Sequence, residues 1–270
     1  MIYDLQKASI LKRISAALLD IILALIIATG IFFAMSSVLK YDKDLNQYNA
    51  YVEEYEGALE KYDIQIGELK YSEITESMYN QLSKDDKKLY DANKEAMQSD
   101  QELVGIYKNV INKLGKLINM TLLMLTLGTM IAILVVEFVI PLFLKNGQTI
   151  GKKMFGICLM MDNGVKVRTT PLFIRALLGK FAIETMIPLY TIILLFFGQV
   201  NAIVLFLAVL MLIASMLLII INPKNALIHD VISYTVVVDK NSQMIFNNQE
   251  ELIKYKEENA KKKATSKRTF

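Results

Sequence analysis

The chain of 270 residues contains no tryptophan, one cysteine and one histidine. Because Cys158 is alone, neither an intrachain disulfide nor a metal site built from thiolates is available. His229 stands beside Asp230 without a second histidine or a nearby nucleophile, so we interpret this pair as a structural polar contact. The net charge of +3 is too small to indicate nucleic-acid binding. We therefore expect a protein that is not an enzyme and that uses no cofactor or metal.

Four long apolar stretches dominate the sequence, over residues 14–39, 118–144, 172–197 and 200–221. Each holds about 20 residues or more, the length that a helix rising 1.5 Å per residue needs to cross a hydrocarbon core of about 30 Å. They predict an integral membrane protein with four transmembrane helices. A cleavable signal peptide is the alternative for the first stretch. That stretch exceeds the roughly 7–15 residues of a signal core and contains Asp20, so we expect a retained anchor.

The charges outside these stretches are distributed unevenly. Residues 1–13, 145–171 and 222–270 are basic, whereas residues 40–117 contain 11 lysines and 16 acidic residues. By the positive-inside rule, both termini and the middle loop are cytoplasmic, and the acidic insert lies outside.

The insert has a regular apolar pattern. Two sets of residues follow one another at alternating spacings of three and four, namely Tyr48, Val52, Tyr55, Leu59, Tyr62, Ile66 and Leu69, and then Leu103, Tyr107, Val110, Leu114 and Leu117. This spacing predicts a coiled-coil-like helical hairpin, or stalk. Ser83, followed by two aspartates, predicts the start of an extra short helix. Disorder is the alternative, because 27 of the 78 residues are charged, but the heptads argue against it.

The middle loop shows a different pattern. Residues 153–161 lead into Asp162, Asn163 and Gly164, and residues 165–168 then alternate apolar with basic side chains. Asn-Gly is a strong turn signal, so we expect a β-hairpin that residues 234–238 could join. Residues 251–268 predict a charged helix that ends in a basic tail suited to anionic lipid. The predicted fold is thus an all-α membrane protein with four transmembrane helices, an extracytoplasmic helical stalk and a small cytoplasmic β-hairpin.

Three of the four apolar stretches carry ionisable residues, which are costly inside a membrane and indicate a functional or structural site. Counting from the cytoplasmic ends places Asp20, Glu137, Lys180 and Glu184 at similar depths in the inner leaflet. We expect the two acids of the first two spans to pair with Lys180 and with Arg175. The candidate polar cluster comprises Arg13, Asp20, Glu137, Arg175, Lys180, Glu184, His229 and Asp230.

This cluster has two interpretations. It could consist of structural ion pairs that fix the register of the helices, with Arg13 paired to Asp230. It could instead form a polar pathway, because three carboxylates against one deeply placed lysine leave an acidic excess and therefore a protonated carboxyl or a bound cation. No inverted repeat or broken helix supports the pathway, and Pro141 and Pro188 are kinks of a kind that spans tolerate.

The sequence resembles the RDD family of bacterial membrane proteins, which is named for one arginine and two aspartates. The arginine corresponds to Arg13, at the start of the first span, and the aspartates to Asp20 and Asp230. Residues 147–157, Gly-Gln-Thr-Ile-Gly-Lys-Lys-Met-Phe-Gly-Ile, resemble the family's Gly-Gln-Thr-x-Gly-Lys segment, and Arg175 matches a further arginine. Tyr234 departs from the pattern, which has a small residue there. The similarity covers residues 10–39 and 118–238 and excludes the insert.

The resemblance implies a bacterial cytoplasmic membrane protein that transports an unidentified ligand, with cation-proton exchange in some members. We therefore expect the cluster to support transport of a small cation or solute. Because four spans leave little room for a pathway within one chain, we expect a homo-oligomer. The alternative is a scaffold or sensor subunit whose stalk binds an extracytoplasmic protein partner. In either case the chain lies in the lipid bilayer.

Overall fold

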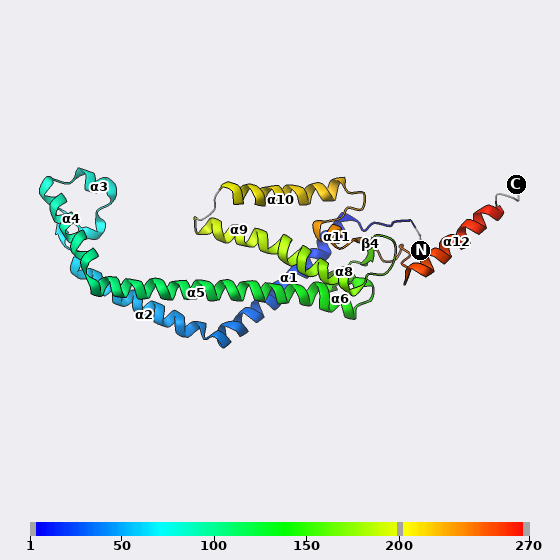
Figure 1. Cartoon of the computed structure of the whole chain (residues 1–270), viewed down its shortest axis with the longest axis horizontal. Helices are drawn as coiled ribbons and strands as arrows, with labels where there is room; N and C mark the ends of the chain where they lie inside the picture. Colours follow the sequence, from blue (N-terminus) through cyan, green and yellow to red (C-terminus); the bar gives the residue numbers. More distant parts are fainter. Residues whose placement is uncertain (1–3, 199–201, 267–270) are drawn as a thin grey trace. The chain divides into compact units, whose positions relative to one another are not determined.

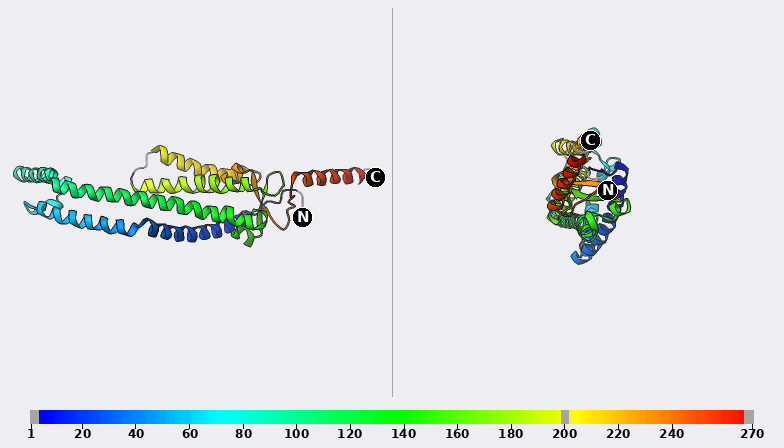
Figure 2. Two further views of the ribbon diagram at one scale, coloured as in Figure 1. Left: turned by 60° about the horizontal axis from the view of Figure 1, so that its bottom comes forward. Right: turned by 90° about the vertical axis from the view of Figure 1, so that its right-hand side faces the viewer.

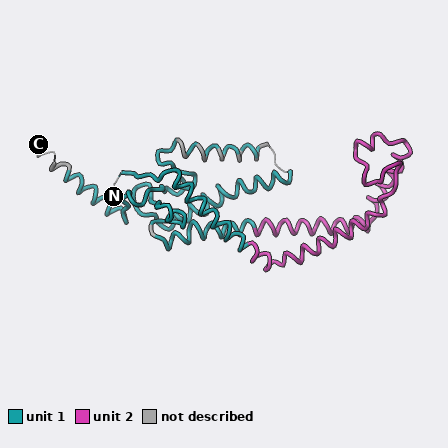
Figure 3. Tube along the Cα trace, turned by 180° about the vertical axis from the view of Figure 1, so that it is seen from behind, with its two compact units in different colours: residues 1–31, 125–270 teal, residues 32–124 magenta. Residues whose placement is uncertain are grey.

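The computed structural model describes residues 4–198 and 202–266. Its described part is mainly helical and contains two sheets of two strands each (Figure 1). The chain divides into two units, shown in different colours in Figure 3. We call Phe32–Met124 the stalk unit, and Met1–Ile31 with Leu125–Phe270 the core unit.

Three helices in the described part of the chain are long and apolar enough to cross a membrane. They are α1 (Ile10–Leu39), the continuous helix Gln101–Phe143, made of α5 (Gln101–Leu134), η3 (Val135–Val139) and α6 (Ile140–Phe143), and the helix Thr169–Phe196, made of α8 (Thr169–Ile174), η5 (Arg175–Met186) and α9 (Ile187–Phe196). A further apolar helix, α10 (Ala202–Ile221), runs beside α9 (Figures 1 and 2). Val200, the predicted start of the fourth span, lies outside the described residues.

The stalk unit contains a helical hairpin, formed by α2 (Tyr41–Leu59) and the first half of α5. Asp44 on α2 forms ion pairs of 2.9 Å with Lys113 and 2.7 Å with Lys116 on α5. The rings of Tyr55 and Tyr107 also meet across the hairpin, 5.4 Å apart. The two helices are therefore joined by ion pairs near the start of α2 and by aromatic packing.

The predicted heptad pattern does not continue to Leu69. The helix α2 ends at Leu59 and gives way to the turn η1 (Glu60–Tyr62) and to a hairpin of β1 (Gln65–Ile66) and β2 (Leu69–Lys70). Gly67 between the strands has φ of 62°, a left-handed conformation that helices do not contain. Ile66 is fully buried in this hairpin and not in the helical interface.

The rest of the stalk unit consists of η2 (Tyr71–Glu73), α3 (Glu76–Gln81) and α4 (Lys84–Ser99). The hydroxyl of Ser83 accepts a hydrogen bond from the Asp86 amide at 3.2 Å, so the predicted extra helix begins at the predicted cap. Tyr90 of α4 packs on the rings of Tyr71 and Tyr79.

The core unit contains a sheet of β3 (Ile157–Met161) and β4 (Thr235–Asp239), paired antiparallel, with Lys7 bridging to Val238. The expected hairpin within the middle loop is therefore wrong in its second strand. The Asp162–Gly164 turn forms, but residues 165–168 contribute only two isolated bridges, Lys166 to Met160 and Val165 to Phe246. The Lys166 amide donates to Phe246 at 2.8 Å, and the predicted run at residues 234–238 joins β3 as β4.

Short elements connect this sheet to the long helices. They are η4 (Lys145–Gly147), α7 (Ile150–Met154) and α11 (Ile228–Ile232), and α12 (Gln249–Ser266) follows the sheet. Side chains from the N-terminal segment and α1, from both strands and from α8 form one apolar core, which contains Ala8, Ala16, Ile157, Leu159, Leu172 and Val237. This core brings together three segments that are distant in sequence, and the charged cluster lies beside it.

Candidate functional site

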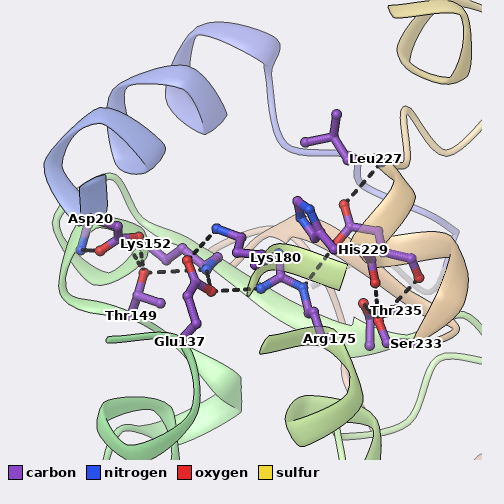
Figure 4. Close-up of polar contacts among 12 residues, drawn as sticks. Asp20, Glu137, Thr149, Lys152, Arg175, Lys180, Leu227, His229, Ser233 and Thr235 are labelled. Carbon is purple, nitrogen blue, oxygen red and sulfur yellow. Dashed lines mark hydrogen bonds and ion pairs between the residues drawn. The ribbon is translucent and has the colours of Figure 1, made fainter. Parts of the chain in front are cut away.

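Asp20 lies on α1 and is 3% exposed. Its carboxylate accepts a hydrogen bond of 2.5 Å from the hydroxyl of Thr149 and one of 2.9 Å from the amide of Gly151 (Figure 4). Gly151 approaches so closely that a Cβ there would lie 2.2 Å from the backbone oxygen of Ala16. The expected ion pair of Asp20 with Lys180 or Arg175 is not formed. The start of α7 satisfies this carboxylate instead.

Glu137, on η3, is the acid that contacts three basic side chains of the cluster. One oxygen accepts from Lys152 Nζ at 3.1 Å and from Arg175 at 2.8 Å, and the other accepts from Lys180 (Figure 4). The side chain of Glu137 is 4% exposed, so the three cations replace water almost completely.

Asp230, on α11, closes the cluster. Arg175 Nε donates to one of its oxygens at 3.1 Å, and Arg13 donates to the other at 3.0 Å. The second oxygen also accepts from the Leu227 amide and so caps α11. Burial opposes ionisation of Asp230, but the guanidinium groups of Arg175 and Arg13 hold its pKa below the usual value. The contacts thus form a ring that begins at Asp20 on α1 and ends at Arg13, which lies on the same helix.

Glu184 of η5 belongs to a side branch of this ring. Both of its oxygens lie 2.7 Å from Nδ1 of His229. Gly179 makes this contact possible, because a Cβ there would lie 2.4 Å from the Cβ of His229. Burial lowers the pKa of His229 below its usual value, so the imidazole is neutral near pH 7.

The π-helical segments η3 and η5 bring these groups together. In an α-helix, Arg175 and Lys180 would point about 140° apart, since they are five positions apart. A π-helix bonds residue i to residue i+5, so residues at this spacing lie nearly above one another. The wider turn therefore lets both cations reach Glu137.

A repeated sequence accompanies the two π-helical segments. Residues 137–142 and 184–189 both read Glu-x-x-Ile-Pro-Leu, so that Pro141 and Pro188 each follow an acid by four positions. A proline has no N–H and collides with the carbonyl four positions earlier, which disfavours α-helical bonding there. This repeat is the feature of the sequence that indicates the two π-helical segments. The interpretation of the prolines only as kinks overlooks it.

The expected acidic excess is wrong. Four acids and four bases meet in the cluster: Asp20, Glu137, Glu184 and Asp230 with Arg13, Lys152, Arg175 and Lys180. Lys152, on α7, was not predicted to belong to the cluster. Burial lowers its pKa to about 8, although the nearby carboxylate of Glu137 favours its charged form. Arg175 is 1% exposed. With His229 neutral, the cluster has no net charge.

Every buried side-chain nitrogen and oxygen atom among the described residues has a hydrogen-bond partner. Within the same residues, no group of three His, Cys, Asp or Glu side chains is placed to hold a metal ion. Tyr234, where the family pattern has a small residue, has φ of 52° and a side chain that is 68% exposed. A left-handed backbone favours glycine, which has no Cβ, so tyrosine is costly at this position.

The family model described as RDD family matches residues 7–234, which is most of the chain. The chain belongs to the RDD family. None of the curated proteins or solved structures compared with it matches. The matched range contains Arg13, Asp20 and Asp230, so in this RDD protein the arginine and both aspartates belong to one ring of contacts. Its apolar helices and its family make it a membrane protein.

We expect the stability of this RDD protein to fall when the pH is lowered from 7.5 to 5.5. The unfolded chain binds a proton at histidine near pH 6.5, whereas buried His229 binds it only at lower pH. The free energy of unfolding should therefore decrease by up to about 1.4 kcal/mol per pH unit in this window. Thermal melting followed by circular dichroism measures the change.

His229 is the only histidine of the chain, which supplies a direct control. In the variant His229→Asn, the melting temperature should be nearly independent of pH between 7.5 and 5.5. A slope that survives this substitution would show that other groups cause it.

Proposed function

We propose that this protein has four transmembrane helices in a bacterial cytoplasmic membrane, with both termini and the middle loop cytoplasmic and residues 40–117 outside. Helix α10, with 20 residues that are apolar except for Ser215, has the length of the fourth span. The N-terminal segment, the middle loop and the segment after α10 pack together, as the Ala8 amide donates to Val237 and β3 pairs with β4. This packing supports a topology in which all three lie on one side of the membrane.

We further propose that the protein is not an enzyme and that its charged cluster supports transport of a small cation or solute. The observation that carries this proposal is a cavity of about 320 Å³ between α1, α5 and η5. Its lining is mainly apolar, but it includes Lys180 and Glu184. Their side chains remain 20% and 25% exposed, whereas that of Glu137 is 4% exposed. Glu184 is therefore the carboxylate that an entering solute or cation reaches.

A homo-oligomer suits this role. The cavity is lined by a few helices near one end of the core unit, and four spans leave little room for a complete pathway. Several copies could supply the remaining walls.

Glu184→Gln tests the proposal. In lipid vesicles that contain the purified protein, flux measured across a panel of cations and under a pH gradient should fall to the level of protein-free vesicles. The amide oxygen still accepts a hydrogen bond from His229, so the fold and the melting temperature should change little. Asp20→Asn is a less specific probe, because Asp20 also holds Thr149 and Gly151 in place.

The matched control is Glu250→Gln on α12, where the residue is exposed. This variant should retain the flux of the natural protein. Equal flux in Glu184→Gln and in the natural protein would contradict the transport proposal.

A scaffold or sensor role is the second candidate, and a specific observation favours it. The cluster is neutral and its buried polar atoms are satisfied, as expected for contacts that hold helices in register. In that case Glu184→Gln leaves every measured flux unchanged, and deletion of residues 60–100 from the stalk unit abolishes capture of an extracytoplasmic protein.

A further inference from the structure

The charges of the cluster balance in number but not in position. In the part of the chain that the structure describes, its bases form ion pairs with two acids, as Lys152, Lys180 and Arg175 contact Glu137, and Arg175 and Arg13 contact Asp230. Figure 4 shows the three cations around Glu137. Asp20 and Glu184 accept hydrogen bonds from other groups and form no ion pair with a lysine or arginine of that part. Negative charge therefore remains at these two carboxylates.

Both of these carboxylates line the cavity between α1, α5 and η5. Asp20 is 3% exposed and is held by Thr149 and Gly151. The side chain of Glu184 is 25% exposed, and its contact is with His229, which is neutral near pH 7. Glu184 therefore presents to the cavity a negative charge that no contacting cation balances.

The rest of the cavity wall is mainly apolar. Helix α1 contributes Ala17, Ala24 and Ala28, and α5 contributes Ala132 and Ile133. The volume of about 320 Å³ lies at the lower end of the range of pockets that hold small organic molecules, about 300–1,000 Å³. The cavity thus suits a ligand that has an apolar body.

The polar groups of the wall disfavour other kinds of cation. A metal ion that has lost its water needs several oxygen ligands, and the described ranges contain no group of three acidic, His or Cys side chains placed to hold one. The hydroxyls of Thr129 and Thr185 donate to backbone carbonyls of their own helices. A ligand with many N–H or O–H donors would leave some of them unpaired, which is costly in an apolar cavity.

A neighbouring cavity of about 150 Å³ confines a cation to the side of Glu184. It shares His229 and other lining residues with the larger cavity. Its wall also includes Arg13, Lys152 and Arg175, which repel positive charge.

The wall that α1 provides reaches the outer surface of that helix. Ile21 and Leu25 line the cavity and are 54% and 60% exposed. Because α1 is one of the helices long and apolar enough to cross a membrane, this side of the cavity borders lipid. A ligand that dissolves in hydrocarbon can enter there.

We propose that this cavity binds a lipophilic organic cation, with the apolar body between α1 and α5 and the charge beside Glu184. A quaternary ammonium compound is the simplest ligand of this class, because it carries a positive charge without N–H donors. The inference rests on the proposed function in that both use this cavity, and it names the chemical class of the solute.

Binding of radiolabelled phenyltrimethylammonium to the purified full chain in detergent tests the proposal. Unlabelled phenyltrimethylammonium should displace the label. tert-Butylbenzene has the same shape with carbon in place of the charged nitrogen, and it should displace the label at least about tenfold less effectively, a difference of about 1.4 kcal/mol. Sodium ions at equal concentration should not displace it.

Two pairs of variants separate charge from shape. Glu184→Gln should weaken binding about tenfold or more, whereas Glu250→Gln on α12 should leave it unchanged. Ala24→Leu fills the cavity without changing its charge and should weaken binding to a similar extent. Ala34→Leu, at an exposed position of the same helix, is its control and should bind like the natural protein. Circular dichroism verifies that the variants are folded.

Three results would overturn the proposal. They are absence of binding, equal displacement by tert-butylbenzene, which would indicate a cavity that takes apolar molecules of any charge, and unchanged binding in Glu184→Gln. The outcome is separable from transport. Flux of inorganic cations without phenyltrimethylammonium binding rejects this ligand class and leaves the transport proposal standing, whereas specific binding in a protein that carries no flux supports the site and contradicts transport.

Discussion

Replacing Arg175 with leucine is expected to destabilise the protein by about 3–5 kcal/mol, the cost of removing one partner from buried ion pairs. Arg175 is 1% exposed and joins Glu137 at 2.8 Å to Asp230 at 3.1 Å. Without it, both carboxylates lose a cation and two helices lose their link. Because the chain has no tryptophan, unfolding is best followed by circular dichroism during heating or denaturant titration.

Arg175→Lys distinguishes charge from geometry. A lysine keeps the positive charge but lacks the planar fork that reaches two acids at once, so intermediate stability is expected. In a double-mutant cycle, Asp230→Asn should cost much less in the Arg175→Leu background than in the natural protein. Additive losses, or an Arg175→Leu protein as stable as the natural one, would show that the ring is not a cooperative unit.

Gly151→Ala is expected to cost about 1–3 kcal/mol or more, the range for inserting a methyl group into a packed site. The new Cβ would lie 2.2 Å from the backbone oxygen of Ala16 and 2.9 Å from Asp20 Oδ1. The contact with the Ala16 oxygen is with backbone and cannot be relieved by a side-chain rotation, so α7 must move away from α1. The same movement lengthens the hydrogen bond from the Gly151 amide to Asp20.

Gly57→Ala is the matched control. Gly57 lies in α2, and nothing is within 4 Å of the position where its Cβ would be. Alanine in an exposed helix should raise stability by about 0.5–1 kcal/mol. If both substitutions change the melting temperature equally, the close approach at Gly151 does not limit packing.

Much of the helical architecture follows from the sequence. The apolar stretches predict the long helices because a single segment in a bilayer must form all of its backbone hydrogen bonds within itself while it presents apolar side chains to lipid. A helix meets both conditions. Ser83 predicts the start of α4 because capping is local chemistry. The strand pairing is predictable in part. The β-branched run at residues 234–238 correctly predicts β4 beside β3. The local turn signal at Asp162–Gly164 does not show that residues 165–168 fail to form a second strand.

The site is predictable in membership and in part of its pairing. The expected ion pairs of Glu137 with Lys180 and Arg175 and of Arg13 with Asp230 are present, and only the expected ion pair of Asp20 is not. Charges inside apolar stretches identify Asp20, Glu137 and Lys180, because such groups must find partners. Lys152 was missed because it lies in a loop next to exposed Lys153, and only the start of α7 at Ile150 decides which lysine points inward. The prediction of an acidic excess was wrong for two reasons. It left out Lys152, and counting positions along a span does not show that the π-helical turn of η5 directs the side chain of Arg175 inward.

The position of Asp230 in the chain has a consequence for biosynthesis. Its partner Arg13 is made 217 residues earlier, and Arg175 is made 55 residues earlier. A nascent chain that has not reached this aspartate holds Arg13 without its acidic partner and Arg175 with Glu137 alone. Synthesis of the last segment therefore completes the cluster.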